Sequence, residues 1–315
     1  LANEAITHPR IISGNLANCL DEAAVIAACS LSACPPGNVV IATQAQADQF
    51  IIAYPNCTQI DGYLAIGNEV TNLNALSNII TITGSLDAGN ATMLTDLSGL
   101  SNLTTIGQDA LIANSALTDL NGLSSLTNIV GWFIIRNNAS LTNINGLGAL
   151  TNIGGYLNIR DNASLTSVNG LVALTNVGGY LQLSNNAALT GINGFSSLTN
   201  VGGEGLAIIN NGALTNVDGF SSLTSITGLL SISDNASLTN VNVLGALVNI
   251  GGFLQFVNNA ALTNLNGLSS LTNVGGEGVS IVNNAALTNV DGFSSLTTIT
   301  GHLNFRDNAS LTSVN

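Results

Sequence analysis

The sequence contains no lysine, and its four arginines are the only strongly basic residues among 315. They are Arg10, Arg136, Arg160 and Arg306. Against 17 acidic residues, they leave a formal net charge of −13. Nucleic acids and anionic membranes both attract proteins through clustered cations. The composition therefore argues against either as a partner.

Long hydrophobic runs are also missing. No apolar stretch reaches the ~18 residues of a membrane-spanning helix, so we expect no membrane span. Charged residues make up only 7% of the chain, against about a quarter in ordinary domains. The chain does not begin with methionine and shows no signal peptide, which favours a processed chain or a fragment.

What the chain has in abundance is one repeated row, cleanest at 150–174. The leucine of a recurring Leu-Thr pair marks each row at nearly equal steps. These leucines are Leu94, Leu117, Leu141, Leu165, Leu189, Leu214, Leu238, Leu262, Leu287 and Leu311. A nearly fixed period of about 24 residues indicates a solenoid.

Within one row, short apolar groups are separated by Asn, Gly, Ser and Asp, which favour turns. The alternation of Leu157 and Ile159 is typical of a strand. We therefore predict an all-β fold: a right-handed β-solenoid of about eleven 24-residue coils over 58–315, with three short strands per coil. Helices are expected only within 1–60. With neighbouring coils about 4.8 Å apart, the rod would be roughly 50 Å long.

An asparagine recurs once per row and is expected to stack into a ladder inside a corner, where its amide satisfies bent backbone groups. Its members are Asn114, Asn138, Asn162, Asn186, Asn211, Asn235, Asn259, Asn284 and Asn308. A longer unit of three rows also recurs at equal steps, from Ile153 to Ile226 and Ile299. The inserted residue in GGEG at 202–205 and 275–278 is interpreted as a β-bulge.

All four cysteines lie before the repeats. We predict an N-terminal segment over 1–33 and a disulfide-closed cap over 34–57, with a strand in NVVIAT and a helix in QAQADQFIIAY. Four cysteines allow three pairings, of which we favour Cys19–Cys29 and Cys34–Cys57. Disulfides favour an oxidising, extracellular setting. No C-x-x-C spacing supports a metal site.

From Cys57, the residues CTQIDGYLAIGN and the following VTNLNALSNIITITGSL resemble the start of a receptor L domain. This is the leucine-rich-repeat-like β-helix of growth-factor receptor ectodomains and fungal cell-wall proteins. The rows also resemble large secreted repeat proteins of Bacteroidetes-type bacteria. The resemblance spans 34–315 and implies a fold rather than a particular ligand. The wide spacing of the leucines does not imply a horseshoe with outer helices.

Catalytic groups are sparse. His8 and His302 are the only histidines and lie at opposite ends of the chain. Asp161, Asp234 and Asp307 follow the three-row period, so three coils, about 14 Å, would separate them. General acid–base catalysis needs groups within reach of one another. We therefore expect no enzyme activity, no metal and no cofactor.

Two surface features suggest binding. Trp132, Tyr156 and Tyr180 lie one row apart on the outward parity of successive strands, which predicts an aromatic column that staples coils together or binds glycans. Two threonine rows resemble those of ice-binding proteins, although threonine is also simply favourable in strands. They are Thr142, Thr166, Thr190 and Thr215, and Thr127, Thr151, Thr175 and Thr199.

The favoured function is structural: an extracellular subunit of a surface fibre or adhesin stalk. We expect copies to assemble head to tail, with residues 1–33 of one subunit covering the last coil of the next. The contact would join an N-terminal set, Leu1, Ile6, Ile11, Ile12 and Asn15, to a C-terminal set, Leu303, Phe305, Leu311 and Val314. Such a contact does not close on itself and propagates as a filament.

Overall fold

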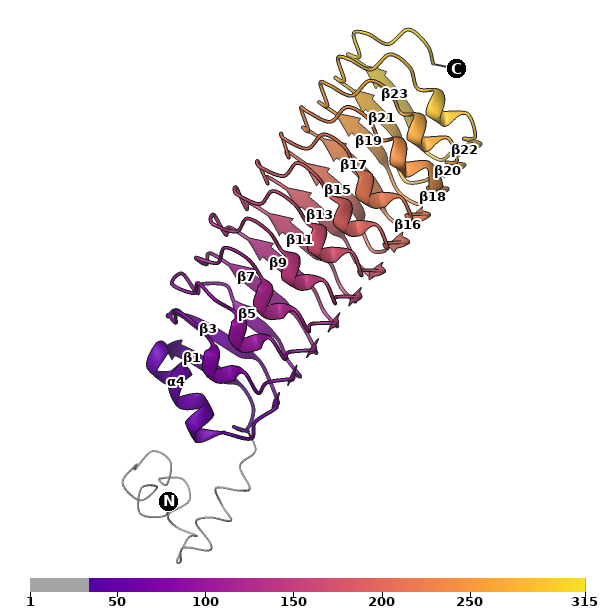
Figure 1. Ribbon diagram of the computed structural model, residues 1–315. Coiled ribbons are helices and arrows are strands. Elements are labelled where there is room, and N and C mark those ends of the chain that lie inside the picture. The colour runs from indigo at the N-terminus through magenta and orange to yellow at the C-terminus, as the bar shows by residue number, and fades with distance from the viewer. Residues whose placement is uncertain (1–33, 315) are drawn as a thin grey trace, which may run out of the picture.

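A computed structural model describes residues 34–314 as a rod of stacked coils (Figure 1). Each coil contributes one strand to each of two parallel sheets, of 12 and 11 strands. In both sheets the strand order simply follows the chain, odd-numbered strands in one and even-numbered strands in the other. The predicted all-β solenoid is confirmed.

The longer sheet carries the longer strands. They are β1 (Val39–Thr43), β3 (Leu64–Glu69), β5 (Leu86–Ala88), β7 (Ala110–Ala113), β9 (Phe133–Arg136), β11 (Leu157–Arg160), β13 (Leu181–Ser184), β15 (Gly205–Ile209), β17 (Leu229–Ser233), β19 (Leu254–Val257), β21 (Gly278–Val282) and β23 (His302–Arg306). In β11, Leu157 and Ile159 are fully buried, whereas Asn158 and Arg160 face outward. Side chains alternate between the two faces of each strand, so each inward-facing position of the strand forms one row of apolar side chains along the core.

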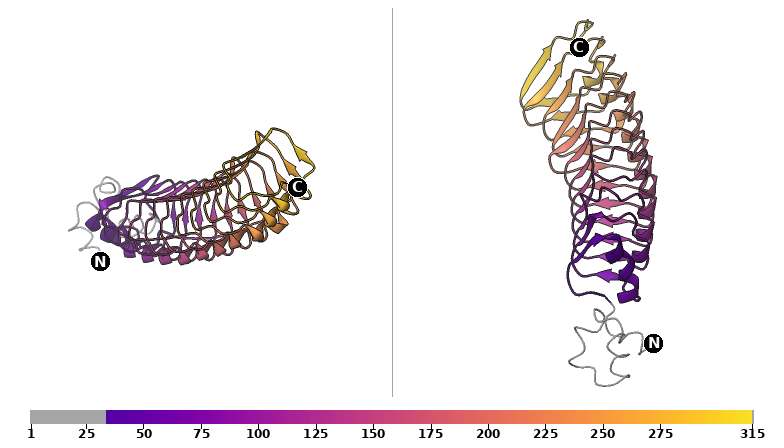
Figure 2. Two further views of the ribbon diagram at one scale, coloured as in Figure 1. Left: turned by 90° about the horizontal axis from the view of Figure 1, so that it is seen from above. Right: turned by 90° about the vertical axis from the view of Figure 1, so that its left-hand side faces the viewer.

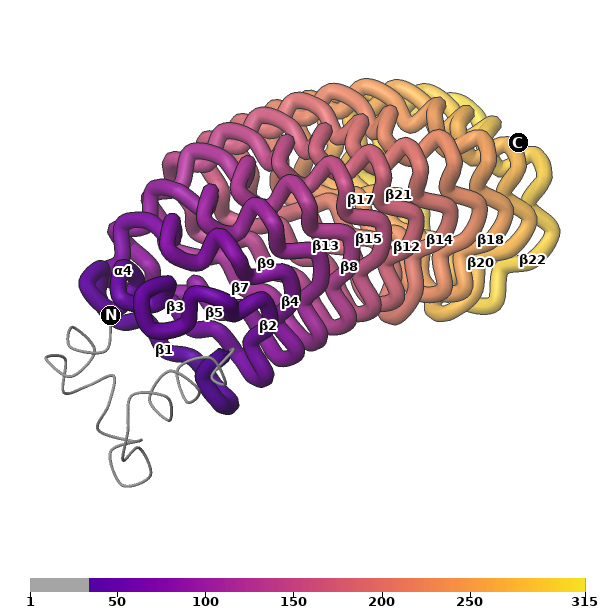
Figure 3. The backbone as a smooth tube through the Cα atoms, turned by 60° about the horizontal axis from the view of Figure 1, so that its bottom comes forward, coloured from indigo at the N-terminus to yellow at the C-terminus, as the bar shows by residue number. Residues whose placement is uncertain are grey.

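The second sheet is built from two-residue strands. They are β2 (Gln59–Ile60), β4 (Thr81–Ile82), β6 (Thr105–Ile106), β8 (Asn128–Ile129), β10 (Asn152–Ile153), β12 (Asn176–Val177), β14 (Asn200–Val201), β16 (Ser225–Ile226), β18 (Asn249–Ile250), β20 (Asn273–Val274) and β22 (Thr298–Ile299). The tube in Figure 3 shows how closely successive coils follow one another.

Among residues 34–314, pairing on the third side of the coils is limited to isolated parallel bridges such as Ser167–Gly191, so the predicted third strand does not form. That side of each coil holds a 3₁₀ turn instead. These turns are η1 (Asn74–Leu76), η2 (Ser98–Leu100), η3 (Asn121–Leu123), η4 (Asn145–Leu147), η5 (Asn169–Leu171), η6 (Asn193–Phe195), η7 (Asp218–Phe220), η8 (Asn242–Ala246), η9 (Asn266–Leu268) and η10 (Asp291–Phe293). In η5 the Leu171 N–H donates to the Val168 carbonyl at 3.1 Å. A Cβ on Gly170 would collide with the Ile144 carbonyl of the preceding coil. The Asn-Gly pair therefore favours a turn that packs closely on its neighbour.

The 3₁₀ turns run along the convex side of a gently curved rod (Figure 2). They also correct the expectation that helices occur only within 1–60. Within 34–314, the single α-helix is α4 (Gln44–Ala53). The turns are compatible with an all-β core because each is only a few residues long.

The N-terminal part of the described chain follows the prediction closely. Strand β1 adds to the edge of the long sheet beside β3, and α4 follows it directly. Thr43 caps the helix: its hydroxyl accepts from the Gln46 N–H, and the Gln46 side chain accepts from the Thr43 N–H. Cys34 and Cys57 form the predicted disulfide. Residues 1–33, including the predicted Cys19–Cys29 pair, lie outside the described residues.

The GGEG insertion is a turn and not the predicted bulge. The Gly205 N–H donates to the Gly202 carbonyl at 3.0 Å, and both Gly203 and Gly205 have positive φ angles. The register from β13 to β15 then runs without interruption. The extra residue is absorbed before the strand because glycine adopts the left-handed conformation at little cost.

Candidate functional site

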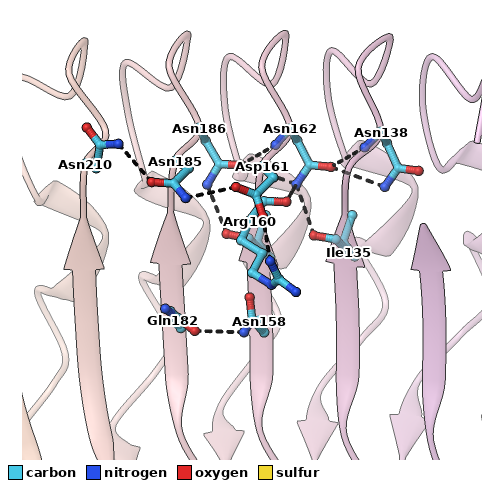
Figure 4. A network of polar contacts seen from close by, with 11 residues as sticks. Ile135, Asn138, Asn158, Arg160, Asp161, Asn162, Gln182, Asn185, Asn186 and Asn210 are labelled. Atoms are coloured by element: carbon cyan, nitrogen blue, oxygen red, sulfur yellow. Dashed lines mark hydrogen bonds and ion pairs between the residues drawn. The ribbon is translucent and has the colours of Figure 1, made fainter. Parts of the chain in front are cut away.

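A ladder of buried asparagines holds neighbouring coils together (Figure 4). Asn162 accepts at Oδ1 from the Asn138 N–H at 3.1 Å and donates from Nδ2 to the Ile135 carbonyl at 3.0 Å. The fully buried members are Asn138, Asn162, Asn186, Asn211, Asn235, Asn259 and Asn284. The predicted corner ladder is confirmed for these residues, and it satisfies backbone groups that water cannot reach.

Asn114 does not belong to this ladder, which corrects the prediction by one position. Ser115 occupies the ladder site, donating from its hydroxyl to Asn138 Oδ1 at 2.7 Å. Asn114 instead has φ 51° and starts a second, outer row of residues with positive φ. That row comprises Asn114, Asn137, Asp161, Asn185, Asn210, Asp234, Asn258, Asn283 and Asp307. Asn and Asp tolerate this left-handed conformation better than other non-glycine residues.

The three aspartates of the three-row period therefore have a structural role at the corner. Asn185 donates from Nδ2 to Asp161 Oδ1 at 2.9 Å, and Asn210 donates to Asn185 Oδ1 at 2.8 Å (Figure 4). Asp161 also pairs with Arg160 at 2.7 Å, and Asp307 pairs with Arg306 at 3.1 Å. Within residues 34–314, no group of three or more His, Cys, Asp or Glu side chains is placed to hold a metal ion.

The threonine rows also join coils. The Thr166 hydroxyl donates to the Thr142 carbonyl at 3.1 Å, and the Thr175 hydroxyl donates to the Thr151 carbonyl at 3.1 Å. Both rows repeat this bond along most of the rod. Their hydroxyl protons are thus directed at the backbone of the preceding coil. Ice binding stays a prediction, which a thermal-hysteresis measurement would test.

Two of the three predicted column members stack. The rings of Trp132 and Tyr156 have centroids 5.7 Å apart and lie within 8° of parallel. Among the described residues, no stacked contact extends from Tyr156 to Tyr180. The two stacked rings cover part of each other's faces because they follow one another along the rod. Tyr156 is 37% exposed.

Nearby carboxylates affect both tyrosines. Burial, and then the charge of Asp109, raises the pKa of Tyr156 above its usual value. Burial, and then the charge of Glu204, does the same to the pKa of Tyr180. Both phenols therefore remain protonated, and able to donate, throughout the neutral range.

Sequence reasoning missed two residues on the same face. Arg136 and Arg160 end strands β9 and β11, in register with each other. They lie four residues after Trp132 and Tyr156, so they share the outward parity already assigned to the aromatics. Applying that parity to the whole strand would have identified them. The structure thus brings the aromatic pair and half of the chain's arginines to one surface.

The C-terminal coil is the other exposed feature. Leu303 occupies an inward position in register with buried Val279, yet it is 57% exposed. Phe305 and Leu311 are partly buried against the core, and Val314 is 63% exposed. Leu303, Phe305 and Val314 help to line a mainly apolar hollow of about 320 Å³. The N-terminal members of the predicted interface, Leu1, Ile6, Ile11, Ile12 and Asn15, lie outside the described residues.

Residues 56–118 match the family model of the Receptor L domain. The match begins beside Cys57 and covers the first coils, so it confirms the resemblance over that stretch. A search of the curated proteins finds no match for the chain. The match and the Cys34–Cys57 disulfide are compatible with an extracellular protein. Helices long and apolar enough to cross a membrane are absent from 34–314. The bacterial type of the resemblance stays a prediction.

Proposed function

We propose that this chain is an extracellular structural subunit of a surface fibre or adhesin stalk, extended head to tail through its coil ends. In this proposal, residues 1–33 of one subunit cover the C-terminal coil of the next. The contact is heterologous and repeats without closing, and strand pairing across the joint continues the sheets of the rod.

The observation that supports the proposal best is the change in side-chain exposure along one row of core positions. The inward position is fully buried at Leu254 and Val279 and 57% exposed at Leu303. In addition, β23 is paired only with β21, so its other edge lacks a partner within 34–314. An open, apolar strand edge is a template for pairing with a further strand. The same surface would equally accept the next coil of a longer polypeptide.

Negative-stain images of this 315-residue chain at high concentration test the proposal. We expect continuous filaments, and isolated rods after deletion of residues 1–15. Wild-type chains that remain isolated rods at every concentration would contradict head-to-tail assembly. Normal filaments from the deletion variant would show that the N-terminal residues do not form the joint.

Glycan binding is the second candidate function, and the Trp132–Tyr156 stack favours it. Exposed aromatic pairs on a regular sheet provide broad contact area together with polar N–H and O–H groups. Alanine at Trp132, Tyr156 and Tyr180 together should abolish glycan-array signals without changing assembly. Unchanged array signals would leave the column with a purely structural role.

A further inference from the structure

The outer face of β9 and β11 holds two positive charges side by side. Arg136 and Arg160 are register partners on adjacent parallel strands, which places their backbones about 4.8 Å apart. Like charges directly opposite each other in a sheet are destabilising. In a chain with only four arginines and a net charge of −13, such a pair is unexpected unless an anion lies between them.

Among residues 34–314, only one carboxylate pairs with these two arginines. Arg160 bonds to Asp161 at 2.7 Å, whereas the residue after Arg136 is the neutral Asn137. Within 34–314, Arg136 has no ion pair of its own. One guanidinium therefore keeps its charge uncompensated, and a planar guanidinium binds a carboxylate through two parallel hydrogen bonds.

The aromatic pair extends this donor surface along the same strands. Trp132 and Tyr156 lie four residues before the arginines, or about 13 Å along the strand. The two rings stack with centroids 5.7 Å apart. Within the described chain, neither the indole N–H nor the Tyr156 hydroxyl bonds to a protein acceptor. A phenol is protonated at neutral pH, and burial and Asp109 raise the pKa of Tyr156 further.

Asn158 lies between Tyr156 and Arg160 in the sequence, and its side-chain oxygen lacks a hydrogen-bond donor. Its Nδ2 group donates to Gln182 Oε1 at 2.7 Å (Figure 4), but its Oδ1 atom is buried without a hydrogen-bond partner. The neighbour on the other side is Ile134, which offers no side-chain donor. A ligand hydroxyl that reached this atom would supply one. An unpaired buried acceptor of this kind is costly in the free protein.

The three-row unit brings this part of the sequence back twice more, but the aromatic pair and the two neighbouring arginines occur together in only one of the three copies. The positions of Trp132 and Arg136 become Gly205 and Ile209 in the second copy, and Gly278 and Val282 in the third. The third copy keeps an Arg-Asp pair at Arg306–Asp307 but has Val282 in place of the neighbouring arginine. The third copy therefore provides a matched internal control.

We propose that Trp132, Arg136, Tyr156, Asn158 and Arg160 form a binding face for acidic oligosaccharides built from uronic acids. One carboxylate bridges the two guanidinium groups, a ring hydroxyl donates to Asn158 Oδ1, and the chain of sugars extends toward the aromatic pair. A sugar acid carries both the hydroxyl and the carboxylate that the face lacks, which favours it over an acidic peptide. The inference rests on the glycan-binding function proposed above and names its ligand class.

The single tryptophan of the chain provides the assay, because all indole fluorescence comes from Trp132. Titration with tri-galacturonate should change that fluorescence in a saturable way. The methyl-esterified trisaccharide should bind about tenfold more weakly or worse, since it lacks the charge. Arg136→Gln should weaken tri-galacturonate binding by a similar factor, the loss expected for one charge-assisted hydrogen bond. Arg306→Gln should leave binding unchanged, and thermal melts should show that both variants fold.

The possible outcomes distinguish the proposed specificity for acidic sugars from the glycan-binding function on which it rests. Equal binding of the acid and its methyl ester, unaffected by Arg136→Gln, would overturn the acidic specificity and leave glycan binding intact. Binding of poly-glutamate as tight as that of tri-galacturonate would replace the sugar with an acidic peptide and overturn the inference. No response to any oligosaccharide, together with an empty glycan array, would remove both.

Discussion

The two ends of the described rod present opposite surfaces. At the N-terminal end, Ile41 and Phe50 are 2% and 7% exposed, because α4 packs on β1 and η1 and the Cys34–Cys57 bridge ties the segment to the first coil. At the C-terminal end, the equivalent core row opens to solvent at Leu303. Within 34–314, the core row is thus covered at Ile41 and exposed at Leu303.

The comparison also shows that interior and terminal coils differ in the number of neighbouring coils that stabilise them. Interior coils are held by buried asparagines whose hydrogen bonds reach both neighbours. A coil at the end of the stack has a neighbour on one side only. In repeat proteins, stability is approximately a sum over such neighbour contacts. The position of a substitution along the rod should therefore decide its cost.

The largest expected effect is the loss of a ladder asparagine inside the rod. Asn186→Ala leaves the Asn162 N–H and the Ile159 carbonyl without their partners. At about 1–3 kcal/mol for each buried unsatisfied group, the free energy of unfolding should fall by about 4 kcal/mol. Asn308→Ala, at the partly buried last corner, should cost about 1 kcal/mol because water can replace the lost bonds.

Urea unfolding of the two variants measures this difference. A similar loss at both positions would mean that the ends of the rod are as dependent on the ladder as its interior. The contrast between covered and uncovered coils would then not govern stability.

A smaller effect is expected from opening the N-terminal cover. The Cys34–Cys57 bridge spans 23 residues, and a loop of that size stabilises a fold by about 3 kcal/mol. Replacement of both cysteines by serine, or reduction of the wild type, should lower the melting temperature. An unchanged melting temperature on reduction would show that the bridge is not needed to hold the cover in place.

The smallest effect on stability is expected at the open end. Leu303→Glu should change the unfolding free energy of the separate subunit by under about 1 kcal/mol, because the side chain is already 57% exposed. It should nevertheless abolish head-to-tail association by placing a charge in the joint. Val172→Glu is the matched control, an apolar residue 46% exposed in mid-rod.

Sedimentation velocity compares the association of these two variants. Association that survives Leu303→Glu, or that is lost equally with Val172→Glu, would remove the C-terminal coil from the joint.

Much of this fold could be predicted from the sequence because the same pattern of residues recurs in nearly every coil. Period, strand parity and the buried ladder all follow from residues such as Leu157, Ile159 and Asn162. The third side of the coil was mispredicted because the apolar group of Leu165 and Val168 is too short for an α-helix and was therefore assigned to a strand, whereas the Asn-Gly pair that follows forms a 3₁₀ turn. Local turn chemistry outweighed the apolar pattern there.

The surface sites were harder to predict for a different reason. Asn114 was placed in the wrong row because two adjacent polar residues recur in every coil, and only backbone geometry separates the buried one from the one with positive φ. Arg136 and Arg160 were missed as a pair because a whole row separates them in the sequence. Register alone makes them neighbours.

A cryo-electron microscopy map of the assembled chain tests the central claim most directly. The account predicts a strand of the neighbouring subunit, contributed by residues 1–33, paired with β23 at about 4.8 Å and continuing the long sheet across the joint. Filaments joined side by side, with the β23 edge and Leu303 still open to solvent, would contradict it.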